Sequence, residues 1–192
     1  MTISAKQVPK IELPVGQVFH RVQRNVVRKG SVEINHMILP PAGTKAGRFC
    51  LATGVTAYLA DSAETALYEA VFRRELVTFV ALENLQSKAL GTFISKKPLR
   101  LVDLRGLEEQ YPVFQSQRIQ HTQAFAQECF DEGYDGILYA SAQHPHHECV
   151  CLFEVGAKKL GFVETWPLVK PGTDILHASV VEAARRSGVE IT

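Results

Sequence analysis

The chain has 192 residues, of which 46% are hydrophobic and 21% charged, a composition that excludes a disordered or fibrous protein and fits one globular domain. Lys and Arg total 21 against 20 Asp and Glu, so the charge balance does not favour direct nucleic-acid binding. No apolar run approaches the ~20 residues that span a bilayer, and the N-terminus has no apolar signal segment. We therefore expect a cytoplasmic protein that does not enter a membrane and whose four cysteines are reduced thiols.

The first half of the chain is predicted to contain four strands and one helix. In chain order, the elements are an extended lead-in at 1–15, a strand at 18–22, a loop at 40–43, a strand at 55–60, a helix from 61 to 71, and strands at 77–82 and 99–104. Alternation within the second strand places Ala57 and Leu59 on one face and Tyr58 on the other. Asp61 followed by Glu64 predicts a capping box at the start of the helix.

The second half is predicted to contain two helices that enclose a pair of strands. The elements are a helix at 119–132, strands at 137–140 and 149–155 with a histidine-rich connection, and a helix at 175–186 that ends at Gly188. Strands and helices do not alternate regularly enough along the chain for a doubly wound sheet. The fold class is therefore expected to be α+β.

Gly47, Arg48, Tyr58 and Glu69 are the first candidates for a binding site. A glycine before an arginine allows a tight turn, and the planar guanidinium can grip phosphate oxygens with two bonds at once. Tyr58 would line the space on its face of the strand, and Glu69 would reach toward it from the helix. Each also has an ordinary structural interpretation: Arg48 as a solvated loop residue, Tyr58 as a half-buried sheet residue, and Glu69 as the partner of Arg73 four residues on.

The segment from Ala46 to Glu69 resembles the central signature of the RES domain family. That signature runs Gly-Gly-Arg-aromatic, a glycine, a strand that ends in Tyr, and a helix that bears Glu. Arg21 stands in His-Arg-Val, which resembles the Tyr-Arg-Val strand near the start of the family domain. Ser141 ends a segment that resembles the family's later serine-bearing strand, and residues 149–153 resemble the strand that follows it.

The resemblance extends over residues 18–155, within a single RES domain expected to occupy 1–192 with its C-terminal helix at 175–188. Ala46 replaces the first glycine of the usual pair, and Cys50 stands where the family often has Asn. The resemblance implies an ADP-ribosyltransferase-like fold of small mixed or antiparallel sheets flanked by helices. It also implies that NAD⁺ is a substrate and that no cofactor and no metal is required.

The resemblance assigns a role to five residues by position. Arg21 and Arg48 would bind the pyrophosphate of NAD⁺, Tyr58 would pack on the nicotinamide side, Glu69 would address the nicotinamide ribose, and Ser141 would line the same pocket. Arg48, Tyr58 and Glu69 would be the catalytic residues. Cleavage of the nicotinamide–ribose bond develops an oxocarbenium-like cation, which a carboxylate can stabilise while bound phosphates orient the reacting carbon.

The resemblance implies a toxin of a toxin–antitoxin pair that acts as an NAD⁺ glycohydrolase or phosphorylase. Its partner would be an Xre-type helix-turn-helix antitoxin, which would also make the DNA contacts. The sequence leaves open whether water, phosphate or a protein accepts the ADP-ribosyl group, and whether the chain forms a homo-oligomer or a hetero-oligomer with the antitoxin. The alternatives are a mono-ADP-ribosyltransferase that modifies a protein and a binding module without activity.

A second cluster brings together residue types that zinc prefers: His144, His146, His147, Cys149 and Cys151. The Cys-x-Cys spacing does not match a zinc knuckle. We interpret the cysteines as small apolar core residues on one side of a strand and the histidines as solvated loop residues. A zinc-binding module without enzymatic activity is the alternative from a different functional class.

Overall fold

The structure is a computed structural model that describes residues 4–44, 47–73, 77–107, 109–111 and 119–192. The strands are β1 (Lys10–Leu13), β2 (Val18–Arg24), β3 (Val32–Ile34), β4 (Met37–Leu39), β5 (Thr56–Ala60), β6 (Phe79–Val80), β7 (Lys88–Ser95), β8 (Leu99–Asp103), β9 (Gly136–Ala140), β10 (Glu148–Phe153), β11 (Leu160–Pro167) and β12 (Glu190–Ile191). The helices are the 3-10 turn η1 (Ala5–Gln7), α1 (Ala63–Ala70), α2 (Leu82–Gln86), α3 (Ile119–Asp131), α4 (Glu154–Ala157) and α5 (Ala178–Ser187).

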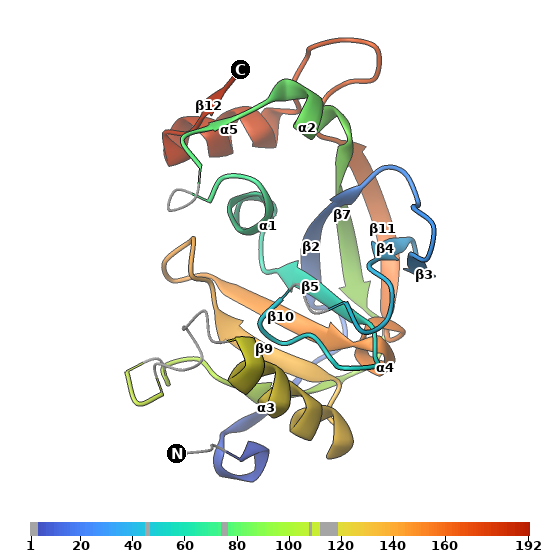
Figure 1. The fold of residues 1–192 in the computed structure, drawn as a ribbon, viewed down its shortest axis with the longest axis vertical. Coiled ribbons are helices and arrows are strands. Elements are labelled where there is room, and N and C mark those ends of the chain that lie inside the picture. The colour runs from blue at the N-terminus through green and yellow to red at the C-terminus, as the bar shows by residue number, and fades with distance from the viewer. Residues whose placement is uncertain (1–3, 45–46, 74–76, 108, 112–118) are drawn as a thin grey trace.

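Eight strands form one curled sheet in the order β1-β8-β9-β10-β5-β2-β7-β11 (Figure 1). Strands β8 and β9 run parallel, and the other neighbouring strands of this sheet are antiparallel. Strands β3 and β4 form a separate hairpin, and β6 pairs with β12. The fold class is thus α+β, as the sequence predicts: a mostly antiparallel sheet flanked by helices.

Two apolar cores lie on the two faces of the large sheet. The first joins the sheet to α1, α3 and α5 through buried side chains such as Leu67, Phe125 and Val180. The second lies on the other face, where Met37 and Leu39 of the β3–β4 hairpin are buried. Because α1 and α3 cover the same face, the side chains that leave this face near β5 are enclosed between sheet and helices.

The start of α1 differs from the prediction by one residue. The N-cap is Ser62, whose Oγ accepts a hydrogen bond from the Thr65 N–H at 3.1 Å. Asp61 instead accepts a hydrogen bond from the Glu148 N–H at 3.0 Å, so its carboxylate is engaged with β10. At the other end of the chain, α5 ends at Gly188 with a φ of 71°, as predicted.

Several strands escape the sequence prediction, and two predicted elements are partly wrong. The lead-in contains β1, and β3, β4, β7 and β11 lie in segments without a predicted strand. Strand β7 buries Ala89, Gly91, Phe93 and Ser95 on one face, but Leu90 and Ile94 lie on the other, so its apolar residues do not follow the alternation typical of a half-buried strand. The predicted strand at 77–82 is reduced to β6 because Leu82 begins α2, and the strand predicted at 149–155 stops where α4 begins.

The four cysteines follow the prediction. All four cysteines are buried free thiols. Cys149 and Cys151 belong to the core shared with α1 and α3, as expected for small apolar residues on one side of a strand. In the part of the chain that the structure describes, no helix is both long enough and apolar enough to cross a bilayer.

Candidate active site

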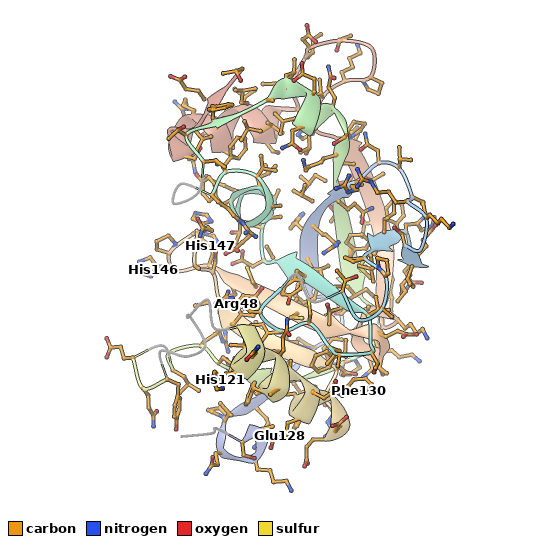
Figure 2. The ribbon with its side chains drawn as sticks, in the orientation of Figure 1. Arg48, His121, Glu128, Phe130, His146 and His147 are labelled. Carbon is orange, nitrogen blue, oxygen red and sulfur yellow. The ribbon has the colours of Figure 1, made fainter. Side chains whose placement is uncertain are left out.

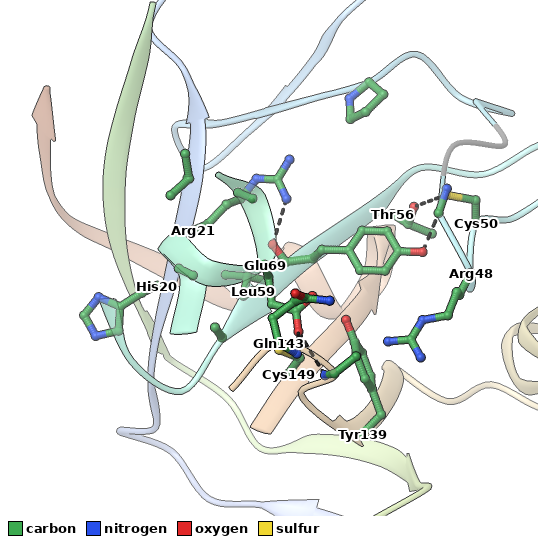
Figure 3. A pocket seen from close by; sticks show the side chains of 18 of the residues that line it. His20, Arg21, Arg48, Cys50, Thr56, Leu59, Glu69, Tyr139, Gln143 and Cys149 are labelled. Carbon is green, nitrogen blue, oxygen red and sulfur yellow. Dashed lines mark hydrogen bonds between the residues drawn. The ribbon is translucent and has the colours of Figure 1, made fainter. Parts of the chain in front are cut away.

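A cavity of about 560 Å³ lies beside β2, β5 and α1 (Figure 3). Strands β2 and β5 pair only through His20 and Ala60, whereas β2 and β7 pair through seven residue pairs. The weak pairing leaves backbone and side chains of β2 and β5 available to a ligand. The volume is within the range of small-molecule sites.

Arg21 lies on β2 and points toward β5. Its Nη1 donates a hydrogen bond to the Tyr58 carbonyl at 2.7 Å. Its Nε is buried and has no hydrogen-bond partner among the described residues. Burial lowers the pKa of Arg21 to about 10, so the guanidinium remains charged at neutral pH. A buried cation with an unused donor is suited to an anionic ligand.

Tyr58 lies on β5 with its ring in the cavity, on the face opposite Ala57 and Leu59, as predicted. Its hydroxyl accepts a hydrogen bond from the Phe49 N–H at 2.8 Å. Burial raises the pKa of Tyr58 well above its ordinary value, so the ring is neutral. A Cβ at Gly47 would lie 2.4 Å from the Tyr58 hydroxyl oxygen. The chain turns tightly here as predicted, since the Cys50 N–H donates to the Gly47 carbonyl at 3.3 Å, and the close packing on Tyr58 leaves no room for a side chain at position 47.

Arg48 is half-buried in the loop that precedes β5, with its guanidinium 5.0 Å from the centroid of the Tyr139 ring and 5.6 Å from that of Phe49. Such contacts hold the cation against aromatic faces. Gln123 of α3 donates a hydrogen bond to the Gly47 carbonyl at 3.0 Å and so fixes the loop from the helix side. Figure 2 shows Arg48 between the strands and α3. The interpretation of Arg48 as a solvated loop residue is wrong.

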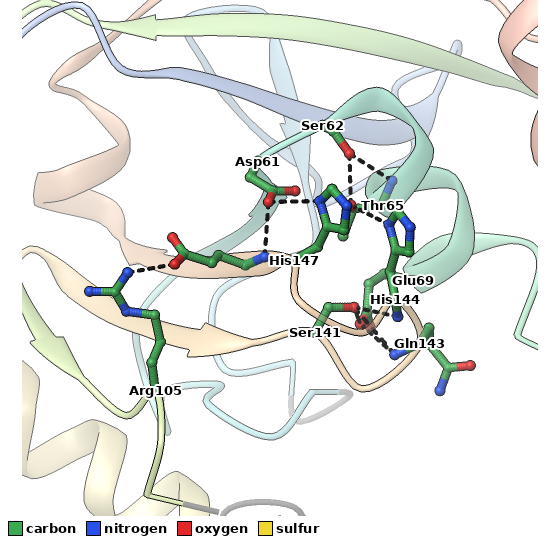
Figure 4. Close-up of polar contacts among 10 residues, drawn as sticks. Asp61, Ser62, Thr65, Glu69, Arg105, Ser141, Gln143, His144 and His147 are labelled. Atoms are coloured by element: carbon green, nitrogen blue, oxygen red, sulfur yellow. Dashed lines mark hydrogen bonds and ion pairs between the residues drawn. The ribbon is translucent and has the colours of Figure 1, made fainter.

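Glu69 reaches the cavity from the last turn of α1. Its Oε1 accepts hydrogen bonds from the Ser141 hydroxyl at 2.5 Å and the Gln143 N–H at 3.3 Å (Figure 4). It also accepts one from the Ala142 N–H at 3.1 Å. Its Oε2 makes no hydrogen bond to any described residue. Arg73 donates from Nε to the backbone carbonyl of Glu69 at 2.5 Å, so it does not neutralise the carboxylate through a hydrogen bond.

The structure brings four of the five predicted site residues to one cavity: Arg21, Arg48, Tyr58 and Glu69. Ser141 does not line the cavity, but its hydroxyl donates a hydrogen bond to Glu69, which does. Arg73 and Tyr139 also line the cavity and were not predicted as site residues. Arg73 lies just beyond the end of α1, four residues after Glu69, and its Nε donates to the Glu69 carbonyl. The first residue of the predicted signature, Ala46, lies outside the described residues.

The histidine-rich loop differs from the prediction. His146 is exposed, but His144 and His147 are half-buried and bonded to Thr65 of α1 and to Asp61 just before it, so the interpretation of these two as solvated is wrong. Their rings stack with centroids 3.8 Å apart. Within the described ranges, no three His, Cys, Asp or Glu side chains are placed to hold a metal ion.

The RES domain family model matches residues 19–170 of the chain. The fold is similar to that of a chain in the crystal structure of the M. tuberculosis MbcT–MbcA toxin–antitoxin complex, with a TM-score of 0.60 and 16% sequence identity. The match covers 82% of this chain and 86% of that chain. The similarity agrees with the predicted α+β fold class, a mostly antiparallel sheet flanked by helices. No curated protein matches the sequence.

Proposed function

This chain belongs to the RES domain family, and we propose that it is a toxin that cleaves the nicotinamide–ribose bond of NAD⁺. One observation carries the proposal: the cavity contains two half-buried arginines together with a carboxylate that is held through one oxygen only. The fold that the chain shares with a member of a toxin–antitoxin complex supports the assignment as a toxin.

The arginines would bind the pyrophosphate. Arg21 has an unused buried N–H, and an anionic oxygen would satisfy it. Arg48 is fixed on aromatic rings at the other side of Tyr58 and presents a second guanidinium to the same ligand. The two charges compensate the two charges of the pyrophosphate, so the dinucleotide would be oriented in the cavity with little motion left to its ribose.

Glu69 would act on the nicotinamide ribose. As the carbon–nitrogen bond breaks, its electron pair leaves with the neutral nicotinamide and the ribose carbon becomes cationic. Three donors hold Oε1, so Oε2 remains available to a ribose hydroxyl and its negative charge stabilises the cation. Water would then add with loss of a proton and give ADP-ribose, or phosphate would add and give ADP-ribose 1″-phosphate.

A cognate Xre-type antitoxin is proposed as the partner that blocks this cavity, in keeping with the toxin–antitoxin complex of the structural neighbour. Such a pair would act in the cytoplasm, with DNA contacts on the antitoxin. Transfer of ADP-ribose to a protein begins with the same cation and is distinguished only by its product.

The test is product analysis of NAD⁺ incubated with antitoxin-free protein, with and without phosphate. Wild type and the control Glu83→Gln, an exposed carboxylate on α2, are expected to release nicotinamide. Glu69→Gln is expected to release it at least ~100-fold more slowly, because the stabilising charge is lost. Intact NAD⁺ with wild-type protein, or full activity of Glu69→Gln, would contradict the proposal.

A further inference from the structure

The loop 141–147 between β9 and β10 contains the histidines to which the proposed reaction assigns no role. It also contains all three donors that hold Glu69. The loop is closed on itself, because the Ser141 N–H donates to the His147 carbonyl at 2.8 Å. The position of the Glu69 carboxylate therefore depends on the position of this loop. The exposed His146 lies at the tip of the loop.

His144 attaches the loop to α1. Its Nδ1 lies 2.8 Å from the hydroxyl of Thr65, which is fully buried and lies 2.7 Å from the hydroxyl of the N-cap Ser62. Its ring meets Tyr68 edge-on, with centroids 4.8 Å apart. Thr65 precedes Glu69 by four residues, so the anchor lies one turn from the carboxylate on the same helix.

His147 makes the second attachment. Its Nδ1 lies 2.9 Å from Oδ2 of Asp61, the same oxygen that accepts the Glu148 N–H (Figure 4). The two imidazole rings are stacked and nearly parallel, with 9° between their planes. The loop is therefore held by two stacked rings, each bonded to a different side chain at the start of α1.

A continuous set of hydrogen bonds leads from His144 to Glu69. The His144 N–H donates to the Ser141 hydroxyl oxygen at 3.0 Å, and the Gln143 N–H donates to the same oxygen at 3.2 Å. With both lone pairs used, the Ser141 hydroxyl hydrogen is directed to Glu69. Displacement of His144 would therefore release the one donor that gives Glu69 its shortest hydrogen bond.

We propose that His144 and His147 are positioning residues that fasten the loop 141–147 to α1 so that its donors converge on one oxygen of Glu69, and that acid releases this attachment. The effect of this attachment on kcat rests on the proposed cleavage of NAD⁺. A proton on His144 would place a positive charge at stacking distance from the His147 ring and close to the charge of Arg186, so the attachment is expected to hold while His144 is neutral.

The charged groups around His144 are consistent with a neutral ring. Burial and then His147 hold the pKa of His144 below its ordinary value; Glu64 and Asp61 act in the opposite direction, and Arg186 of α5 lowers it further. Glu64 and Arg186 are themselves ion-paired, which offsets the effect of each on the ring. Neutral His144 thus prevails at neutral pH.

The test compares Thr65→Val and His144→Phe with His146→Asn. Valine keeps the shape of Thr65 and removes its hydroxyl, and phenylalanine keeps the ring contacts of His144 and removes its titration. His146 lies in the same loop, is exposed and has a φ of 67°, which asparagine tolerates. Two readouts are needed: kcat and KM for NAD⁺ as a function of pH, and hydrogen exchange of the Ala142 and Gln143 amides.

We expect Thr65→Val and His144→Phe to lower kcat about five- to tenfold, the value of one hydrogen bond, with KM for NAD⁺ within twofold. Both are expected to speed exchange of the Ala142 and Gln143 amides, and His144→Phe to lose the acid-side decline in kcat. His146→Asn should match wild type. Unchanged kcat, or unchanged exchange, in the two variants would overturn the proposal. Exchange requires no NAD⁺, so it decides the attachment even if wild-type protein leaves NAD⁺ intact and the proposed function fails.

Discussion

The two sides of the cavity are built differently. Arg21 and Tyr58 stand on strands of the large sheet, and their polar atoms are fixed by backbone groups of neighbouring segments. The position of Glu69 depends on hydrogen bonds from the loop 141–147, and this loop is itself attached through the side chains of His144 and His147. We therefore expect that substitutions can separate substrate binding from chemistry. Changes on the sheet side should act on the affinity for NAD⁺, and changes on the loop side should act on kcat.

The largest effect is expected for Arg21→Met. Removal of a guanidinium that contacts a phosphate should raise KM for NAD⁺ about 100-fold, the value of a charged hydrogen bond of roughly 3 kcal/mol. The thermal midpoint should not fall, because methionine spares the cost of burying a charge. Steady-state kinetics and thermal unfolding check both parts. A fall in kcat with an unchanged KM in Arg21→Met would contradict the assignment of the sheet side to substrate binding.

Gly47→Ala is expected to be next in size. The added Cβ would collide with the Tyr58 ring, so the loop or the ring must move, at a cost of about 1–3 kcal/mol in the free energy of unfolding. Denaturant unfolding measures this cost. Gly161→Ala on β11, where the three atoms nearest to the added Cβ all belong to the flexible Lys96 side chain, controls for the loss of a glycine. Equal costs in the two variants would mean that the contact with Tyr58 does not constrain position 47.

Ser141→Ala is expected to lower kcat about tenfold and to leave KM for NAD⁺ nearly unchanged. The serine gives Glu69 one of its three hydrogen bonds, and loss of a hydrogen bond to a charged group is worth about 1.5 kcal/mol or more. The control Ser87→Ala removes a hydroxyl that donates to the Asn84 carbonyl at the end of α2, and it should change neither kcat nor KM. An increase in KM without a fall in kcat would place Ser141 on the binding side instead.

The smallest effect is expected from pH. The pKa of His144 is lower in the folded chain than its ordinary value of 6.5, mainly through burial, so the unfolded chain binds this proton more readily. The contribution of His144 to stability is therefore complete above pH 6.5 and declines as the pH falls from there through the folded pKa. Denaturant unfolding between pH 7.5 and 5 in wild type and His144→Phe isolates this contribution. A decline of the same size in the variant would assign it to other groups.

The sequence predicted the parts of the site that local pattern governs. Alternation in β5 placed Tyr58 opposite Ala57, and helical spacing placed Glu69 on α1. The role of Gly47 was missed because it follows from a ring eleven residues later in the chain, a contact that no local rule reports. The sequence predicts solvated rings for His144 and His147, and this is wrong because their partners, Thr65 and Asp61, lie about eighty residues away in the chain.

The fold was predicted least well where the apolar residues of a strand do not alternate or where the strand lies at an edge of the sheet. β7 contains Gly91 and has few polar positions, and thus gives no alternation to detect. β1 is recognisable only by its pairing with β8, in which Ile11 lies opposite Leu101. Such strands are defined by tertiary neighbours more than by their own residues.

The most direct test of the account is a calorimetric titration of NAD⁺ into Glu69→Gln, combined with an assay for nicotinamide in the same cell. The substitution leaves Arg21, Arg48 and Tyr58 in place and removes the charge on which the chemistry depends. We predict that NAD⁺ binds with an affinity close to the wild-type KM and stays intact. Absence of binding, or nicotinamide release at the wild-type rate, would contradict the separation of a binding side from a reactive side in this cavity.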